Sequence, residues 1–313
     1  MLAFALRTLS VRPAGAAPLG YDLDQQCTAS DTDPAQLPCT GGGSTSAADD
    51  DGGVDNGFGK VVDIFTGSVG DPDAAGDDPA AKPINNDVRR GLRTLFLFLG
   101  GYNGEANDDK VVLTILPTSQ LLASGHTCEA EAGIVDGGPL WNGCDVWSHR
   151  PGAVFVSGTK NPIADLDGYV ADGTLVIKTG GKSLDLDFGD GHLVVQEATL
   201  TAQLAQQTVD GGMMKWVMSN GVFAGRGSMP ATRSGLLQFR VMDSPVCLDD
   251  GTSAAALTSL CRARDIPLSA KTDGGVCDAI SMGFGFAAES AVVGTEGSAA
   301  RDAGCPAIEP ACP

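Results

Sequence analysis

Glutamate is scarce in this 313-residue sequence, where seven Glu stand beside 32 Asp, and only 17 residues are aromatic. Asp competes with the helical backbone for hydrogen bonds and favours turns and caps, so this composition argues against a helical bundle. Basic residues are also few, and the net charge is −19. Because phosphate binding depends on Lys and Arg, we expect divalent cations rather than nucleic acid as partners.

Several familiar motifs are absent. The sequence has no CxxC pair, no run of about 18 apolar residues and no GxSxG motif. These absences argue against a thioredoxin-type or zinc-ribbon site, a transmembrane segment and a serine acyl-transfer centre, respectively.

Nine cysteines at wide, irregular spacing favour disulfides, which imply an oxidising compartment outside the cytoplasm. One thiol must remain unpaired, because the number is odd. Short loops would be closed by Cys27 with Cys39, Cys128 with Cys144, and Cys305 with Cys312, leaving Cys247, Cys261 and Cys277 as a set of three.

The N-terminal 87 residues divide into two parts. Residues 1–20 form a poor or truncated export signal, because Arg7 and Arg12 interrupt the apolar stretch. Residues 21–87 form an acidic Asp/Gly-rich linker with 14 Asp, no Glu and two Lys. A short helix over about 56–69 is predicted within the linker and docks on the next domain, with Asp55 or Asn56 as its cap. Its apolar face comprises Phe58, Val61, Val62, Phe65 and Val69.

Residues 88–293 consist of short apolar runs separated by Gly, Asn and Asp, a pattern typical of antiparallel β structure. We therefore expect a mainly β fold, an antiparallel β-sandwich of the concanavalin or jelly-roll type. The segment 219–221 would turn between two strands, and a few helices would precede the last strand. Residues 294–313 would form an irregular tail pinned by disulfides.

Closely spaced carboxylates predict calcium sites, because Ca²⁺ takes six to eight oxygen ligands. A solvated acidic linker and an ordinary wet sheet face are the alternatives. The candidate ligands are Asp22, Asp24, Asp31, Asp33, Asp49, Asp51 and Asp55 in the linker, and Asp165 and Asp167 in the sheet region.

Two further sets of residues are candidates for carbohydrate chemistry. Glu129 and Glu131 would point the same way on a strand, as the nucleophile and acid of a retaining glycosidase do; a disulfide-held surface loop is the alternative. Tyr102, Trp141 and Trp147 could stack sugars near loops, and burial in the core is the alternative.

Four short segments resemble exported, β-rich proteins abundant in myxobacteria and their relatives. They are Gly20-Tyr21-Asp22-Leu23-Asp24, Asp51-Gly52-Gly53-Val54-Asp55-Asn56, Gly101-Tyr102-Asn103-Gly104, and Cys277-Asp278-Ala279-Ile280-Ser281 leading into Gly283-Phe284-Gly285-Phe286. The resemblance implies a surface or periplasmic location and a β-rich body, but no activity. Such proteins typically begin with a secretion or lipoprotein signal, and the missing lipobox departs from that pattern.

These observations together predict an exported binding or interaction module, with calcium, a glycan or another surface protein as partner. A carbohydrate-active enzyme or glycan-binding protein on a concanavalin-like sandwich is the second hypothesis. A purely structural surface protein is the third.

Overall fold

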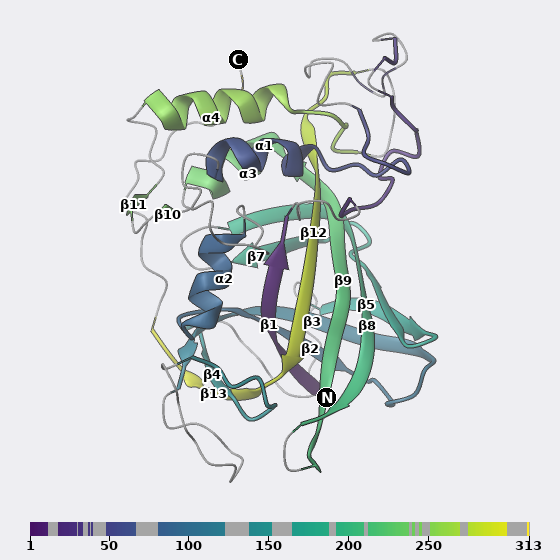
Figure 1. Cartoon of the computed structure of the whole chain (residues 1–313). Coiled ribbons are helices and arrows are strands. Elements are labelled where there is room, and N and C mark those ends of the chain that lie inside the picture. The colour runs from purple at the N-terminus through teal and green to yellow at the C-terminus, as the bar shows by residue number, and fades with distance from the viewer. Residues whose placement is uncertain are drawn as a thin grey trace.

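The computed structural model describes most of the chain (Figure 1). The described residues are 1–11, 18–29, 31–33, 37, 39, 48–66, 81–122, 138–151, 165–187, 192–209, 212–237, 240–241, 244–245, 251–269, 275–298 and 312.

Eight antiparallel strands close into a barrel. The order around the barrel is β3-β2-β1-β12-β9-β8-β6-β5, and pairing of β5 with β3 closes it. The barrel strands are β1 (Leu2–Ser10), β2 (Leu95–Gly100), β3 (Asp108–Leu121), β5 (Asp165–Ala171), β6 (Thr174–Lys178), β8 (His192–Thr208), β9 (Met214–Ser228) and β12 (Ala279–Ser290).

Further strands lie outside the barrel. Strand β4 (Val146–His149) pairs with β3, and β13 (Val292–Glu296) pairs with β4 in parallel. Strand β7 (Ser183–Asp187) pairs with the first part of β8. A separate small sheet joins β10 (Arg240–Val241) and β11 (Ser244–Pro245).

Helices cover one end of the barrel. Helices α1 (Gly57–Thr66), α3 (Met229–Leu237) and α4 (Gly251–Arg262) lie at the upper end in Figure 1, and α2 (Lys82–Arg89) lies beside β1. Helix α1 confirms the helix predicted near 56–69, whereas α2 was not predicted. No helix among the described residues combines the length and apolar character needed to cross a membrane.

The barrel interior is filled with apolar side chains, as an eight-stranded barrel allows. Leu97, Leu113, Leu175, Ile177 and Phe284 belong to one buried cluster. On the other face of β1 and β2, Ala5, Phe96 and Phe98 form a second cluster with Leu116 and Trp147. The sheet is therefore covered on both faces where β4 and β13 lie.

The predicted sandwich is wrong, because the sheet closes on itself. Closure needs β1, which pairs with β2 on one side and β12 on the other. The predicted fold lacked this strand, because residues 1–20 were expected to be an export signal, and a sheet without β1 stays open. The antiparallel β class and the helices before the last strand were predicted correctly.

The predicted turn at 219–221 is a β-bulge within a single strand, β9. Asn220 has a φ of 48° there, and the register of β9 shifts against both β8 and β12. A Cβ at Gly221 would lie 2.6 Å from the ring of Phe286. The ring therefore occupies the space that any larger side chain at position 221 would need. Asn-Gly chemistry therefore bends the strand instead of reversing the chain.

Two disulfides join described residues, and neither was predicted as a pair. Cys39 bonds Cys277, and Cys261 bonds Cys312. The predicted pairs of Cys27 with Cys39 and of Cys305 with Cys312 are wrong, because spacing along the chain does not fix which cysteines meet in space. Cys27 is a free thiol on the surface. Cys144 is disulfide-bonded, while Cys128, Cys247 and Cys305 lie outside the described residues.

Candidate metal centre

Asn56 anchors the acidic segment against strand β12. Its side-chain oxygen accepts the backbone N–H of Gly59 at 2.9 Å, which caps α1, and that of Gly283 at 3.1 Å. Its side-chain nitrogen donates to the carbonyl of Leu19 at 2.9 Å. A side chain at Gly283 would collide with that carbonyl, so the chain crosses β12 where only glycine fits.

Asp55 directly precedes this cap and is 4% exposed. Its backbone N–H donates to the carbonyl of Tyr21 at 3.1 Å. Its carboxylate Oδ2 accepts the N–H groups of Leu23 at 2.6 Å and Asp24 at 3.2 Å. These bonds wrap residues 22 to 24 around the carboxylate and bring Asp22, Asp24 and Asp55 together.

The resulting group, here called the Asp triad, could hold a metal ion. Asp22 is exposed, Asp24 half-buried and Asp55 buried, and each offers a carboxylate oxygen within 4.8 Å of the others. Two oxygens bound to one Ca²⁺ at about 2.4 Å lie at most about 4.8 Å apart, so the spacing permits a shared ion. This is the one such group among the residues that the structure describes.

The Asp triad is electrostatically strained without a cation. Burial raises the pKa of Asp55 to about 8, and the charges of Asp24, Asp265 and Asp49 add to the rise. Burial likewise raises the pKa of Asp24, with Asp49 and Asp22 adding to it, while the Gln26 N–H and Arg226 oppose it. A cation among these carboxylates would favour their charged forms.

Arg226 contacts the loop formed by residues 22 to 24 and also binds other groups. Its guanidinium donates to the carbonyls of Leu23 and Pro267, and its Nε lies 3.3 Å from a carboxylate oxygen of Glu197. It therefore fixes the backbone of the loop to the barrel. Asp49 is similarly engaged, because one of its oxygens accepts the N–H of Thr28 at 2.6 Å.

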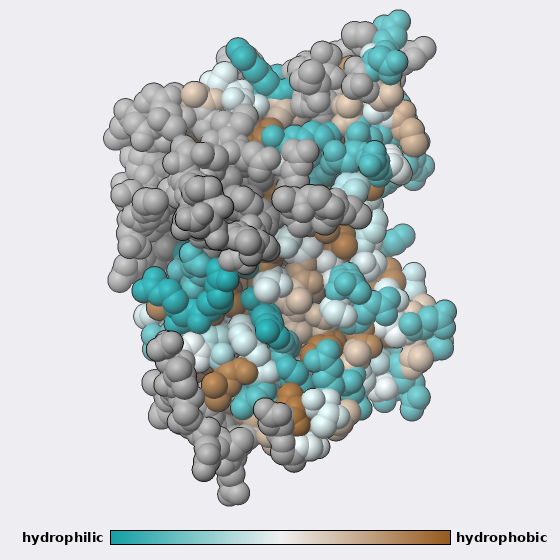
Figure 2. Space-filling model, in the orientation of Figure 1, coloured by the Kyte–Doolittle hydropathy of each residue, from teal (hydrophilic) through white to brown (hydrophobic). Residues whose placement is uncertain are grey.

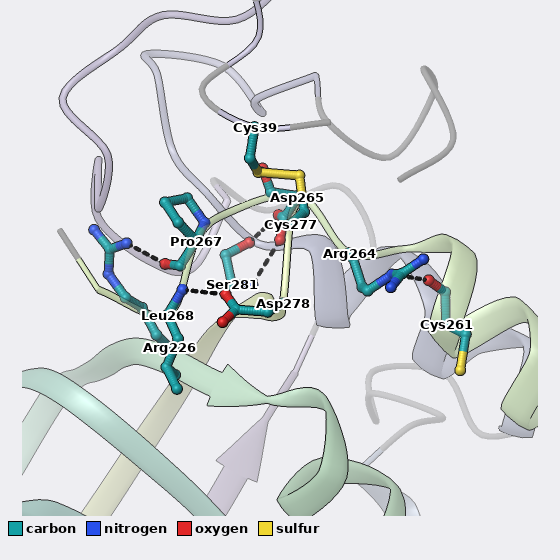
Figure 3. Close-up of a disulfide and its surroundings, with 10 residues drawn as sticks. All are labelled: Cys39, Arg226, Cys261, Arg264, Asp265, Pro267, Leu268, Cys277, Asp278 and Ser281. Carbon is teal, nitrogen blue, oxygen red and sulfur yellow. Dashed lines mark hydrogen bonds between the residues drawn. A yellow bond between two sulfur atoms is a disulfide. The ribbon is translucent and has the colours of Figure 1, made fainter. Parts of the chain in front are cut away.

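The buried side chain of Asp265 supports the start of α1 through Ser281 (Figure 3). Asp265 accepts hydrogen bonds from both the N–H and the hydroxyl of Ser281, whose oxygen in turn accepts the N–H of Gly57 at 2.6 Å. Burial raises the pKa of Asp265 to about 6, although the bonds from Ser281 act against the rise. The adjacent Cys39–Cys277 disulfide joins the acidic segment to a residue two positions before the start of β12.

The other predicted metal ligands are not part of the Asp triad. Asp31, Asp33 and Asp51 are exposed in the same segment. Asp165 lies on β5, where its Oδ1 accepts the hydroxyl of Thr114 at 2.6 Å, and Asp167 is exposed on that strand. The region containing Asp165 and Asp167 is therefore a barrel strand.

The three predicted aromatic ligand residues are also divided. Trp147 is fully buried and lies 6.3 Å from half-buried Trp141, measured between ring centroids. Tyr102 contacts Trp216 instead, at 5.4 Å. Trp147 therefore has no exposed ring face on which a sugar could stack. Trp216, which lies on β9, was not among the predicted ligand residues.

Glu129 and Glu131, the predicted catalytic pair, lie outside the described residues. Sequence reasoning also missed Asn56 as the residue that joins the helix cap to β12, although it named Asn56 as a cap candidate. The signal was its position beside Asp55, directly before the apolar helix face.

The fold and site define the chain as an acidic, disulfide-bonded β-barrel protein with a candidate cation site. Comparison with models of known protein families, with curated proteins and with solved structures finds no match.

Proposed function

We propose that the protein is an exported binding module of the cell surface or periplasm, stabilised by Ca²⁺ at the Asp triad. The observation that carries the proposal is the buried carboxylate of Asp55, which backbone hydrogen bonds bring close to two other carboxylates. Burying a carboxylate is costly unless it is paired or binds a metal, so a cation offsets a cost that the fold otherwise bears.

Calcium fits the Asp triad better than magnesium does. Carboxylate oxygens are hard ligands, which suit both ions, but Mg²⁺ requires nearly ideal octahedral geometry at about 2.0–2.1 Å. The Asp triad mixes one exposed, one half-buried and one buried side chain on a loop. Such irregular sites suit Ca²⁺, which accepts variable geometry and fills its remaining positions with water or carbonyl oxygens.

Export is supported by the disulfides between described residues, because disulfides persist in oxidising compartments. The resemblance to exported myxobacterial proteins points the same way. A role in binding is favoured because the described residues include an acidic cluster that could hold a cation, whereas the glycosidase hypothesis rests on the sequence pair Glu129 and Glu131 alone.

Calcium titration tests this proposal. Isothermal calorimetry and thermal melting are performed on the oxidised full chain, and we expect one saturable site and a melting temperature that rises with Ca²⁺ and returns with chelator. The variant Asp24→Asn should lose both effects. Asp31→Asn, which removes the same charge from an exposed position in the same segment, should keep both. A flat titration of the wild type contradicts the proposal.

A further inference from the structure

Two half-buried aromatic residues close the barrel at the end opposite the helices. Tyr102 follows β2 and Trp216 lies on β9, with β1 and β12 between those two strands. Their rings nevertheless meet edge to face, with centroids 5.4 Å apart, so the contact crosses the end of the barrel. Both pack against the interior core. The hydroxyl of Ser290 fixes Trp216 by bonds to its N–H at 2.8 Å and its carbonyl at 2.9 Å.

Two exposed methionines flank this pair in the strand register. Met1 is 66% exposed and Met214 is 57% exposed. Met1 precedes Leu2, which pairs with Leu99 near the end of β2, and Met214 begins β9 two residues before Trp216. Figure 2 shows hydrophobic residues scattered among hydrophilic ones on the face that it presents. Aromatic residues and Met are enriched in protein interfaces.

An acidic rim borders the same end. Glu105, Asp109 and Asp172 are exposed and Asp108 is half-buried, whereas Lys110 is the one basic side chain within the 101–110 loop and 171–174 turn. The rim is ordered by its own hydrogen bonds. The Tyr102 hydroxyl donates to the carbonyl of Glu105 at 2.9 Å, and the N–H of Asp172 donates to the side chain of Asn107 at 3.1 Å. An ordered surface loses little conformational entropy on binding.

We propose that this surface, named the aromatic end, binds a partner protein segment that presents Lys or Arg beside apolar side chains. The aromatic end is defined by Tyr102, Trp216, Met1, Met214 and the rim of Glu105, Asp108, Asp109 and Asp172. The inference rests on the proposed binding role and names its partner class.

Charge complementarity decides between partners. The rim carries four carboxylates and the whole chain has a net charge of −19, so basic segments are attracted and a second copy of the chain is repelled. Lys and Arg also stack favourably on Tyr and Trp rings. A neutral sugar would use the aromatic rings but would leave the carboxylates without a function.

The test uses a fluorescent synthetic peptide that alternates Lys with Leu, and a matched peptide in which every Lys is Glu. Binding to the calcium-loaded full chain is followed by anisotropy. We expect saturable binding of the Lys peptide alone, weakened at least tenfold in Tyr102→Ala and in the double variant Glu105→Gln/Asp109→Asn. The double variant Asp31→Asn/Asp51→Asn removes two exposed charges from the acidic segment and should bind like the wild type.

Three results would overturn the assignment. They are absence of peptide binding, equal weakening in both double variants, and binding of a neutral oligosaccharide such as cellohexaose in place of the Lys peptide. The calcium-dependent melting shift is measured on the same samples. If that shift persists while peptide binding fails, the aromatic end is wrongly assigned and the calcium proposal stands. If the shift is missing while the Lys peptide still binds, the calcium proposal fails and the assignment of the aromatic end stands.

Discussion

Replacing Asp55 by Asn separates the electrostatic cost of the Asp triad from its geometry. The amide has nearly the same shape, and its oxygen can accept the N–H groups of Leu23 and Asp24 as Oδ2 does now. The substitution replaces a buried ionisable group by a neutral one and a carboxylate ligand by an uncharged amide oxygen, which attracts a cation less. We therefore expect the variant to fold, to be more stable than the wild type in chelated buffer near pH 8, and to lose its response to calcium.

The sign and size of the effect follow from proton linkage. Asp55 keeps its proton in the folded state up to about pH 8, whereas in the unfolded chain it ionises near pH 4. The unfolded state therefore binds fewer protons in this interval, and stability falls as the pH rises from about 4 to about 8. Asp265, with a pKa of about 6, acts in the same direction below pH 6. From pH 6 to 8, we expect Asp55 to cost the wild type roughly 2 kcal/mol.

Urea unfolding of the oxidised protein at pH 5, 6, 7 and 8, without calcium, measures this cost. The wild type should lose stability between pH 6 and 8, and Asp55→Asn should remain nearly level. Saturating Ca²⁺ should restore the wild type at pH 8 and leave the variant unchanged, because the cation takes the place of the proton. Wild-type and variant curves that run parallel from pH 6 to 8 would refute the reasoning.

Three other substitutions test separate parts of the structure. Gly283→Ala should push Leu19 from β12, lower the unfolding free energy and weaken calcium binding in calorimetry, because the new Cβ collides with the Leu19 carbonyl; unchanged affinity would contradict this packing. Trp147→Ala should cost about 3–5 kcal/mol in urea unfolding with calcium affinity retained, because the side chain is fully buried in the second core cluster. Replacing both Cys39 and Cys277 by Ser should cost about 2–5 kcal/mol and reduce calcium affinity, since this disulfide ties the acidic segment to the start of β12; an unaffected melting temperature would speak against it.

The fold class could be predicted from the sequence, but the closure could not. Alternation of apolar and polar residues marked β6, β7 and most of β8, because one face of each strand packs on the core. Alternation is the same in a sandwich and in a barrel. The difference lies in the pairing of β3 with β5 and in the presence of β1. Arg7 suggested a faulty export signal, but it is a residue of β1 that forms an ion pair with Glu289.

The candidate site was predicted in part. The closely spaced carboxylates of the acidic segment suggested calcium ligands, among them Asp22, Asp24 and Asp55, and the structure brings these three together. The same spacing also suggested Asp31, Asp33 and Asp51, which stay on the surface. What distinguishes the first three is the backbone contact between residues 21 and 55, and residue spacing alone cannot reveal a contact across more than 30 residues.

Occupation of the Asp triad by a calcium ion can be observed directly. Anomalous diffraction from crystals of the full chain grown in calcium locates such an ion directly. We expect a peak between the carboxylates of Asp22, Asp24 and Asp55, with oxygen distances of about 2.3–2.6 Å. Saturating calcium with no peak among these three side chains would contradict the calcium proposal.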